Sequence, residues 1–531
     1  MTRHRLARLQ VALVPACVLT ALAVSGCLRI TKSKLAPLSK RSQMVESPVR
    51  AFLADGSVVV FMDGVHVSDS AVVGRGAYGG TEAGQRFDLL REPAGAVTSV
   101  PLDSVLGLEA FDRETDVGLS LLASLGVTVL VVGGAVALAC AADPKCFGSC
   151  PTVYSVDENG EVLEAEAFSY SISPLLEGRD TDRLSVGADA AGRVELEIRN
   201  EALETHFINH LELVEVRHAA AERVVTDEDN IPVIVRALHG FERIVDRDGR
   251  DVRPELSGRD DRVFASSRDR IAEARSGDDR DWIEATLPPM GGDTAAVVLR
   301  LRNSLLNTVL FYELMLDAQG ARALDWMARD LQRIGTAVEL GSWFHGTMGL
   351  RLEVETDTGF QEVSRFGDTG PIAWKEVAFR VPVRSDAPTR FRLAFLTDAW
   401  RIDQMRWSAD VRDAPTRTIP ASAITPLVGA AADDLEAKVA AADDAYLVTS
   451  AGTGFVATFH VGPDLPDERR TFLLSSQGYY TEWVRPNWIR GTVDGGPFRP
   501  TDGTIPDLME LWTELQGPME EAFHATRIPV R

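Results

Sequence analysis

Histidine and carboxylate side chains stand close together at residues 204–212, where they could ligate a metal ion. His206 and His210 are four residues apart, and Glu204 and Glu212 lie beside them. Because alternate residues of a strand share a face, a strand here would present imidazole and carboxylate groups together, a ligand set that suits zinc. The His-Glu-x-x-His order of zinc peptidases is absent. We therefore favour histidines at a sheet surface or edge, and we predict no metal site.

A second candidate for metal binding is the acidic stretch at residues 246–251, Asp-Arg-Asp-Gly-Arg-Asp. Oxygen ligands at alternate positions with a turn glycine are typical of calcium loops, but an EF-hand loop needs a Glu at its twelfth position, where Ser257 stands. The interleaved arginines also oppose a cation. A charged β-turn is the favoured interpretation.

Motifs for catalysis are lacking. The sequence contains no G-x-S-x-G, no P-loop and no dinucleotide-binding fingerprint. A catalytic triad can assemble from distant positions, so an enzyme stays open as an alternative. We predict no catalytic residue and no cofactor.

Aromatic residues are concentrated in the last 190 or so positions. Exposed rings beside Asp or Arg could stack on sugars, and the candidates for glycan binding are Trp400, Trp407, Tyr479, Tyr480 and Trp483. The alternative, which we favour, is the aromatic core of a β-sandwich.

The cysteines fall into two groups. Cys17 and Cys27 lie near the N-terminus, and Cys140, Cys146 and Cys150 lie together. In an oxidising envelope, the spacing of Cys146 and Cys150 favours a local disulfide. Metal binding by the three clustered thiols is the alternative, but no fourth ligand is evident nearby.

Composition limits the partners. The chain has 531 residues, with 55 Lys and Arg against 78 Asp and Glu and a formal net charge of −23. Nucleic acid is excluded as an expected partner, because such binding draws on a basic surface that neutralises phosphates. The 45% of hydrophobic residues is ample for several globular cores.

The N-terminus has the layout of a secretory signal. Arg3, Arg5 and Arg8 precede an apolar stretch that ends at Val24-Ser25-Gly26-Cys27. A Cys after two small residues resembles the lipobox of bacterial lipoproteins. The resemblance implies that residues 1–26 are removed and that Cys27 carries the lipid. An ordinary signal or anchor helix is the alternative. Residues 27–47 then form a tether.

A second apolar segment spans residues 117–142, without one charged residue. As a helix it would extend about 39 Å, more than the roughly 30 Å of a hydrocarbon core, so it is a candidate transmembrane helix. A buried helix is the alternative. With a lipid on Cys27, one crossing would place the C-terminal part in the cytoplasm; we expect that part to be extracytoplasmic.

The fold class expected from hydrophobic periodicity is mainly β with several domains. Short alternating runs separated by Asp-Gly pairs predict a small SH3-like β-barrel at 48–112. Alternation at 194–198 and 211–216 predicts a β-sandwich at 146–220 with one wet face. Asp and Arg dominate 221–290, which we interpret as an acidic charged insert of loops.

The remaining region, 291–531, is predicted to mix β-sandwich and helices. Apolar residues at helical spacing from Leu324 to Ile334 predict a helix that ends at Gly335, and further helices are expected near 432–444 and 507–524. Alternation between Leu350 and Phe395, followed by Trp400 to Asp403, is similar to the jelly-roll pattern of galactose-binding-like domains.

Four strings resemble uncharacterised bacterial envelope lipoproteins: Cys146 to Tyr154 (CFGSCPTVY), Leu196 to Glu204 (LEIRNEALE), Leu211 to Leu213, and Gly478 to Trp483 (GYYTEW). No activity is established for that group. The resemblance implies an extracytoplasmic, β-rich, multi-domain lipoprotein.

The expected function is that of a membrane-anchored, non-enzymatic binding or scaffold protein of the bacterial cell envelope, whose partner is an envelope glycan or protein. The alternative is an envelope-polymer hydrolase with an aromatic C-terminal module that holds a glycan.

Overall fold

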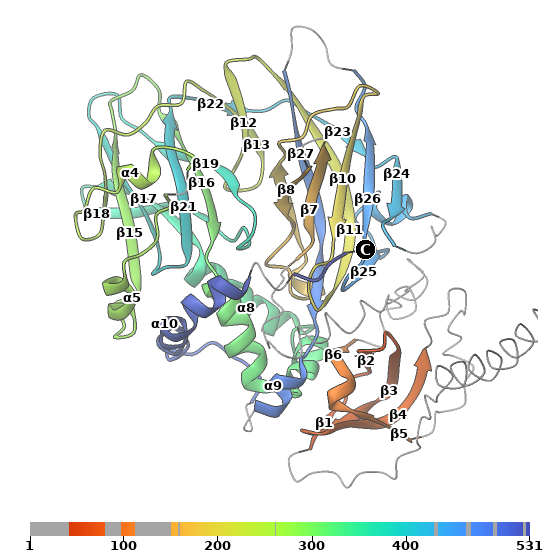
Figure 1. The fold of residues 1–531 in the computed structure, drawn as a ribbon. Helices are drawn as coiled ribbons and strands as arrows, with labels where there is room; N and C mark the ends of the chain where they lie inside the picture. The colour runs from red at the N-terminus through yellow and green to blue at the C-terminus, as the bar shows by residue number, and fades with distance from the viewer. Residues whose placement is uncertain are drawn as a thin grey trace, which may run out of the picture. The chain divides into compact units, whose positions relative to one another are not determined.

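The computed structural model shows a mainly β protein with several sheets and few helices (Figure 1). It describes residues 42–79, 97–111, 150–157, 160–260, 262–428, 434–463, 469–491, 496–523 and 527–530. All of them belong to one compact unit, residues 39–531. The strands form five separate sheets among the described residues, so the expected mainly β, multi-domain fold class is confirmed.

Several predicted features lie outside the described residues. These are the signal peptide at 1–26, Cys27, most of the tether, the apolar segment 117–142, and Cys146. They stay predictions. Within the part of the chain that is described, no helix is both long and apolar enough to cross a membrane.

The N-terminal sheet is open, so the prediction of a closed SH3-like barrel at 48–112 is wrong. Its strands are β1 (Gln43–Val45), β2 (Val49–Leu53), β3 (Val58–Val67), β4 (Ala71–Gly79), β5 (Val97–Pro101) and β6 (Val105–Ala110). The order is β5-β4-β3-β2-β6, with β1 on β3. The β6 edge does not close onto β5, because Leu108 exchanges backbone hydrogen bonds of 2.9 and 2.8 Å with Val484.

The first sandwich combines strands from two distant parts of the sequence. The early strands are β7 (Thr152–Asp157), β8 (Gly160–Glu166), β9 (Gly178–Arg183), β10 (Arg193–Arg199) and β11 (Glu204–His218). The late strands are β23 (Thr416–Pro420), β24 (Ala423–Pro426), β25 (Leu447–Ser450), β26 (Gly454–His460) and β27 (Arg469–Glu482). They form the sheets β24-β26-β10-β7-β8 and β23-β11-β27-β9, with β25 on β11. Val194, Leu196 and Ile198 of β10 are buried in the shared core while Glu195 is exposed, as the alternation predicted.

The second sandwich uses the region expected to be charged loops. Its strands are β12 (Glu222–Asp227), β13 (Pro232–Arg236), β14 (Ile244–Asp246), β15 (Arg280–Leu287), β16 (Thr294–Asn303), β17 (Leu350–Thr356), β18 (Gly359–Phe366), β19 (Lys375–Pro382), β20 (Thr389–Leu396), β21 (Trp400–Ser408) and β22 (Asp410–Asp413). The sheets are β21-β16-β19-β12-β13-β22 and β14-β15-β20-β17-β18. Residues 221–290 thus supply four strands, because the charges stand mostly in turns and on outer faces.

One of those turns is the candidate calcium loop, and it is a charged β-turn, as favoured. Asp246 Oδ1 accepts backbone hydrogen bonds from Asp248 (3.1 Å) and Arg250 (2.9 Å), and the Arg250 guanidinium lies 2.9 Å from Asp246 Oδ2. The carboxylate is therefore already satisfied by the turn itself.

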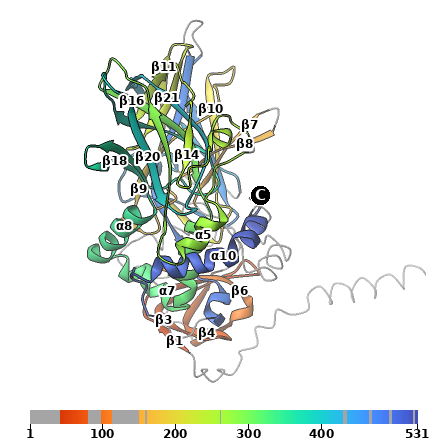
Figure 2. The same cartoon turned by 90° about the vertical axis from the view of Figure 1, so that its left-hand side faces the viewer.

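The helical segments are η1 (Leu102–Ser104), η2 (Pro174–Leu176), α4 (Arg253–Leu256), α5 (Arg268–Ala274), α6 (Leu306–Val309), η3 (Leu310–Leu316), η4 (Asp317–Gln319), α7 (Arg322–Asp325), η5 (Trp326–Asp330), α8 (Ile334–Met348), η6 (Glu436–Val439), α9 (Pro486–Gly491) and α10 (Thr504–Phe523). The two longest, α8 and α10, lie below the sandwiches in both views (Figures 1 and 2). The predicted C-terminal helix is confirmed as α10, whereas the described part of 432–444 holds a single 3-10 turn.

The predicted helix stop at Gly335 is wrong. Arg333 is extended (φ −91°, ψ 121°), so the helical periodicity breaks there and α8 starts at Ile334. Leu324, Met327 and Leu331 are buried as expected, but Ile334 is 73% exposed because it follows the break.

Candidate functional site

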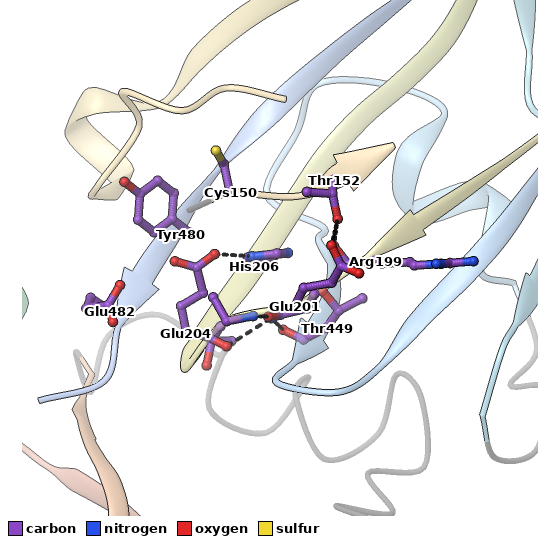
Figure 3. Close-up of polar contacts among 12 residues, drawn as sticks. Cys150, Thr152, Arg199, Glu201, Glu204, His206, Thr449, Tyr480 and Glu482 are labelled. Carbon is purple, nitrogen blue, oxygen red and sulfur yellow. Dashed lines mark hydrogen bonds and ion pairs between the residues drawn. The ribbon is translucent and has the colours of Figure 1, made fainter. Parts of the chain in front are cut away.

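Three of the strings that resemble envelope lipoproteins meet in one place (Figure 3). β10 pairs with β7 in the register Arg199↔Thr152, and β11 pairs with β27 in the register Glu204↔Glu482 and His206↔Tyr480. We call Cys150, Glu204, His206, Tyr480 and Glu482 the buried cluster. Strands that are more than 200 residues apart in sequence therefore place these side chains side by side.

Two carboxyl groups face each other in the buried cluster. Glu204 and Glu482 are 0% and 1% exposed and stand directly opposite on paired strands. Burial raises the pKa of Glu204 to about 8. Burial also raises the pKa of Glu482, whereas Arg485, 2.8 Å away, acts to lower it. One arginine cannot balance two carboxylates, so we assign a protonated state to Glu204 at neutral pH.

Arg485 links the buried cluster to two aromatic rings. Its guanidinium carbon lies 4.7 Å from the ring centroids of both Tyr312 and Trp488. The Tyr312 hydroxyl donates to Glu482 Oε2 at 3.2 Å. The charge of this buried arginine is thus held by one carboxylate and two π faces.

His206 is neutral. Burial lowers the pKa of its imidazole to about 3, and its Nε2 lies 2.6 Å from Glu204 Oε1. Because a protonated carboxyl and a neutral imidazole carry no net charge, this hydrogen bond is compatible with complete burial.

Cys150 closes one side of the buried cluster. Its thiol donates to Glu166 Oε1 at 3.1 Å, and Glu166 Oε2 accepts the backbone N–H groups of Ile372 (2.7 Å) and Ala373 (3.2 Å). Cys150 therefore connects the first sandwich to the loop before β19. The predicted disulfide with Cys146 stays a prediction, because Cys146 lies outside the described residues.

The favoured interpretation of a surface or edge histidine is wrong for His206, which is 0% exposed, and the zinc alternative at 204–212 fails because the strand is irregular. The pairing of β11 with β27 shifts register between Ile208 and His210. This bulge puts His206 and His210 on opposite faces of the sheet, and His210 lies 3.5 Å from Glu212 instead. Among the described residues, no group of three or more His, Cys, Asp or Glu could hold a metal ion.

Gly478 lies opposite the bulge and predicts a clear stability effect. A Cβ at this position would lie 2.3 Å from the Phe207 carbonyl oxygen, which is backbone and cannot rotate away. We expect Gly478→Ala to lower the free energy of unfolding by about 1–3 kcal/mol. Urea denaturation would measure it, with Gly496→Ala, whose Cβ meets nothing within 4 Å, as the control. Equal stability of both variants would contradict the close approach.

The protonated state of Glu204 predicts a pH dependence. Its folded pKa of about 8 lies above the unfolded value of 4.5, so its contribution to stability is full below pH 4.5 and is lost as pH rises toward 8. Gln does not titrate, so the free energy of unfolding of Glu204→Gln should rise by about 3 kcal/mol relative to that of wild type between pH 5 and pH 8. Comparing the two proteins at each pH removes the opposite contribution of His206.

Denaturant unfolding at each pH would measure this gain, with Glu195→Gln as the control. Glu195 is exposed on the neighbouring strand β10, so its substitution should leave the pH dependence unchanged. If the free energy of unfolding changes with pH in the same way for wild type and Glu204→Gln, then Glu204 is ionised in the folded protein and the assignment is wrong.

The five aromatic candidates for glycan binding are mostly covered by protein. Trp400, Tyr479, Tyr480 and Trp483 are buried, and Trp407 is partly buried. Trp483 stacks on Phe52 of the N-terminal sheet with ring centroids 3.7 Å apart, and Tyr479 stacks on Phe207 at 4.5 Å. Their rings form core and inter-sheet contacts, which is the interpretation the sequence favoured.

A cavity of about 440 Å³ lies next to the buried cluster. Tyr312 and Tyr480 belong to its wall, so the cluster holds two wall residues in place. The apolar lining comes mainly from the segment before β9, from η3 and from α8. It includes Ile172, Leu176, Leu310, Phe311, Met315, Leu340 and Phe344. Polar groups interrupt this lining at Ser169, Glu177, Glu228, Asn307, His345 and Asp368.

Ser169 is the most informative polar group of the cavity. Its side chain is 8% exposed, and its hydroxyl has no hydrogen-bond partner. A buried hydroxyl without a partner carries a free-energy cost that a ligand or a water molecule in the cavity would remove. The arrangement therefore suits a ligand with an apolar body and polar ends.

A second buried ionic group joins the two sandwiches. Lys375 of β19 is 5% exposed and forms ion pairs with Asp180 and Asp182 of β9, the latter at 3.2 Å. Asp182 and Lys375 also line a polar cavity of about 330 Å³. Burial and the charge of Asp180 raise the pKa of Asp182, while Lys375 lowers it.

Sequence reasoning found part of this site. The resemblance strings contain Cys150, Glu204, Tyr480 and Glu482, whereas Tyr312, Ser169 and Lys375 carried no signal in the sequence. Arg485 follows the Gly478 to Trp483 string by two residues, and its apolar neighbours Trp483, Val484 and Trp488 were the available clue.

Comparisons with known proteins do not assign a family. No protein-family model and no curated protein matches the chain. Among solved structures, a cycloalternan-forming enzyme from Listeria monocytogenes, in complex with a pentasaccharide substrate, is 8% identical with a TM-score of 0.15. The match covers 70% of this chain and 29% of the enzyme.

A GH31 alpha-xylosidase from Xanthomonas citri is 9% identical with a TM-score of 0.16, over 81% of this chain and 38% of the xylosidase. The chain therefore spans well under half the length of both proteins. At these TM-scores the likeness carries no argument about fold or activity.

Proposed function

We propose that the chain is a lipid-anchored protein of a bacterial cell envelope that acts by binding, without catalysis, and that its ligand occupies the 440 Å³ cavity. The observation that carries the proposal is an apolar cavity whose wall includes a few polar residues, among them Ser169, a buried residue whose hydroxyl has no partner. The lipobox-like sequence at Val24 to Cys27 supports the anchor.

The buried carboxyl pair favours binding over the hydrolase alternative. A glycosidase needs two carboxyl groups that flank an accessible sugar. Glu204 and Glu482 are buried and cannot reach a polymer, and Glu482 instead accepts the hydrogen bond of the Tyr312 hydroxyl.

The test fills the cavity from one side. Gly341 of α8 lines the cavity, and a side chain there would extend into it past Leu176. We expect Gly341→Phe to weaken binding of adamantylmethanol, a compact apolar probe, by about tenfold or more. Isothermal titration calorimetry on the full chain in detergent would measure it.

The matched control is Gly335→Phe, because Gly335 is an exposed glycine of the same helix and its Cβ would meet nothing within 4 Å. Gly335→Phe should bind as wild type does, which separates the cavity from partition into micelles. Equal binding by both variants would refute the cavity as the ligand site.

A further inference from the structure

The charge of the cavity wall points to the kind of ligand it takes, and this step rests on the proposed function. Three carboxyl side chains, Glu177, Glu228 and Asp368, are among the described residues that line the cavity, and no Lys or Arg is. His345 adds no charge at neutral pH, because burial and the neighbouring Arg365 lower its pKa.

These carboxyls have hydrogen-bond donors but no cation. Glu177 accepts from Asn209 (2.8 Å), Gln477 (3.0 Å) and the Tyr446 hydroxyl (2.8 Å). Asp368 accepts from the backbone N–H of Gly370 at 3.1 Å. Within the described chain, neither takes part in an ion pair.

Glu228 is less satisfied still. Its Oε2 is buried, and the side-chain hydrogen bond that acts on its carboxyl group comes from Ser364. Burial raises the pKa of Glu228, and the negative charges of its sequence neighbours Asp227 and Asp229 raise it further. Burial likewise raises the pKa of Asp368 to about 6, with Asp180 adding to the effect.

Nearby cations are already used by other carboxylates. Arg365 is held by Glu362 at 2.7 and 2.9 Å, and Arg485 by Glu482 at 2.8 Å. Lys375 pairs with the aspartates of β9. A positive charge for the cavity must therefore come from its occupant.

We infer that the cavity binds an amphiphile of opposite charge: a molecule with a compact apolar body and a protonated amine, whose ammonium group pairs with Asp368 and Glu228. Rotation of the Ser169 side chain would bring its buried, unpartnered hydroxyl to a further polar atom of the same ligand. An ammonium group would offset the desolvation of the carboxylates, whereas a carboxylate ligand would add to the repulsion.

The experiment compares three probes with one body: adamantylmethylamine, adamantylmethanol and adamantane carboxylate. On the full chain at pH 7.5 or so, we expect the amine to bind about tenfold or more tightly than the alcohol, and the carboxylate more weakly than both. Calorimetry on wild type and Gly341→Phe would identify the part of each affinity that depends on the cavity.

Charge-neutral variants then locate the recognition. Asp368→Asn combined with Glu228→Gln should reduce the preference for the amine over the alcohol to about threefold or less, because the ammonium group loses both carboxylate partners. Asp229→Asn is the matched control, because Asp229 is the exposed neighbour of Glu228 and does not line the cavity.

The outcomes separate the two proposals. Cavity-dependent binding of amine and alcohol with equal affinity would overturn the amine inference and leave the binding function standing. An amine preference that survives the double variant, or a preference for the carboxylate, would also overturn it. If Gly341→Phe leaves the affinity for all three probes unchanged, the proposed function itself is refuted.

Discussion

Replacing Arg485 with methionine is expected to lower the free energy of unfolding by about 3–5 kcal/mol, because it leaves a buried carboxylate without its counter-charge. Arg485 is buried, its guanidinium lies 2.8 Å from Glu482, and Glu204 stands across the strand pair from Glu482. Without the arginine, both carboxyls must be protonated in the fold. Chemical denaturation at pH 7 would measure the loss.

A second substitution shows whether the loss is electrostatic. Adding Glu482→Gln to Arg485→Met removes the uncompensated charge, so we expect the double variant to recover about half of the lost stability or more. If the double variant is as unstable as Arg485→Met, then the arginine acts through packing on Tyr312 and Trp488 and the electrostatic account is wrong.

Arg490→Met is the matched control for Arg485→Met. Arg490 lies in α9, five residues further on, and pairs with the exposed Asp103. An exposed ion pair contributes about 0–1 kcal/mol, so this variant should be nearly as stable as wild type. A comparable loss in both variants would contradict the special role of burial.

The local part of the fold was predictable from sequence. The alternation of Val194, Leu196 and Ile198 with Glu identifies a strand with one wet face, and apolar spacing identifies α10. Both patterns depend on residues within one element. The pairing of β11 with β27 joins residues more than 200 positions apart, and no periodicity carries that information.

One wrong prediction and one disfavoured alternative depended on features that need the partner segment. The N-terminal sheet stays open because Val484 occupies the edge at Leu108, which the N-terminal sequence by itself cannot reveal. The zinc alternative assumed a regular strand, whereas the bulge after Ile208 rotates His210 to the other face. The residue opposite the bulge is Gly478, far along the chain, where the two backbones approach too closely for a Cβ.

Only part of the candidate site could be predicted from the sequence, for a related reason. Motif strings draw attention to Cys150 and Tyr480, but a cavity is a property of the space between elements. Its wall combines η3, α8 and the loop after β18, none of which contains a chemical motif. Ser169 and Asp368 become informative only when their burial and partners are known.

Lys375→Met is expected to cost about 3–5 kcal/mol of unfolding free energy at pH 8, because Asp180 and Asp182 would lose their buried cation. Burial and Asp180 already raise the pKa of Asp182 to about 7 while Lys375 lowers it, so without Lys375 this pKa would lie higher still. A folded pKa above the unfolded value contributes stability at low pH that is lost as pH rises, so the loss relative to wild type should grow as pH rises above about 7. Denaturation across this pH range would measure it.

Adding Asp182→Asn to Lys375→Met should flatten that pH dependence and restore about half of the lost stability. The control is Arg384→Met, which breaks an exposed ion pair with Asp386 and should cost less than about 1 kcal/mol.

Lys375 also joins β19 of the second sandwich to β9 of the first, and the 440 Å³ cavity takes wall residues from both sandwiches. Lys375→Met should therefore weaken binding of the adamantyl probes in the cavity, even under conditions in which the variant stays folded. The double variant, Lys375→Met with Asp182→Asn, should bind these probes more tightly than Lys375→Met does. Unchanged probe binding in folded Lys375→Met would show that the sandwiches keep their arrangement without this ion pair.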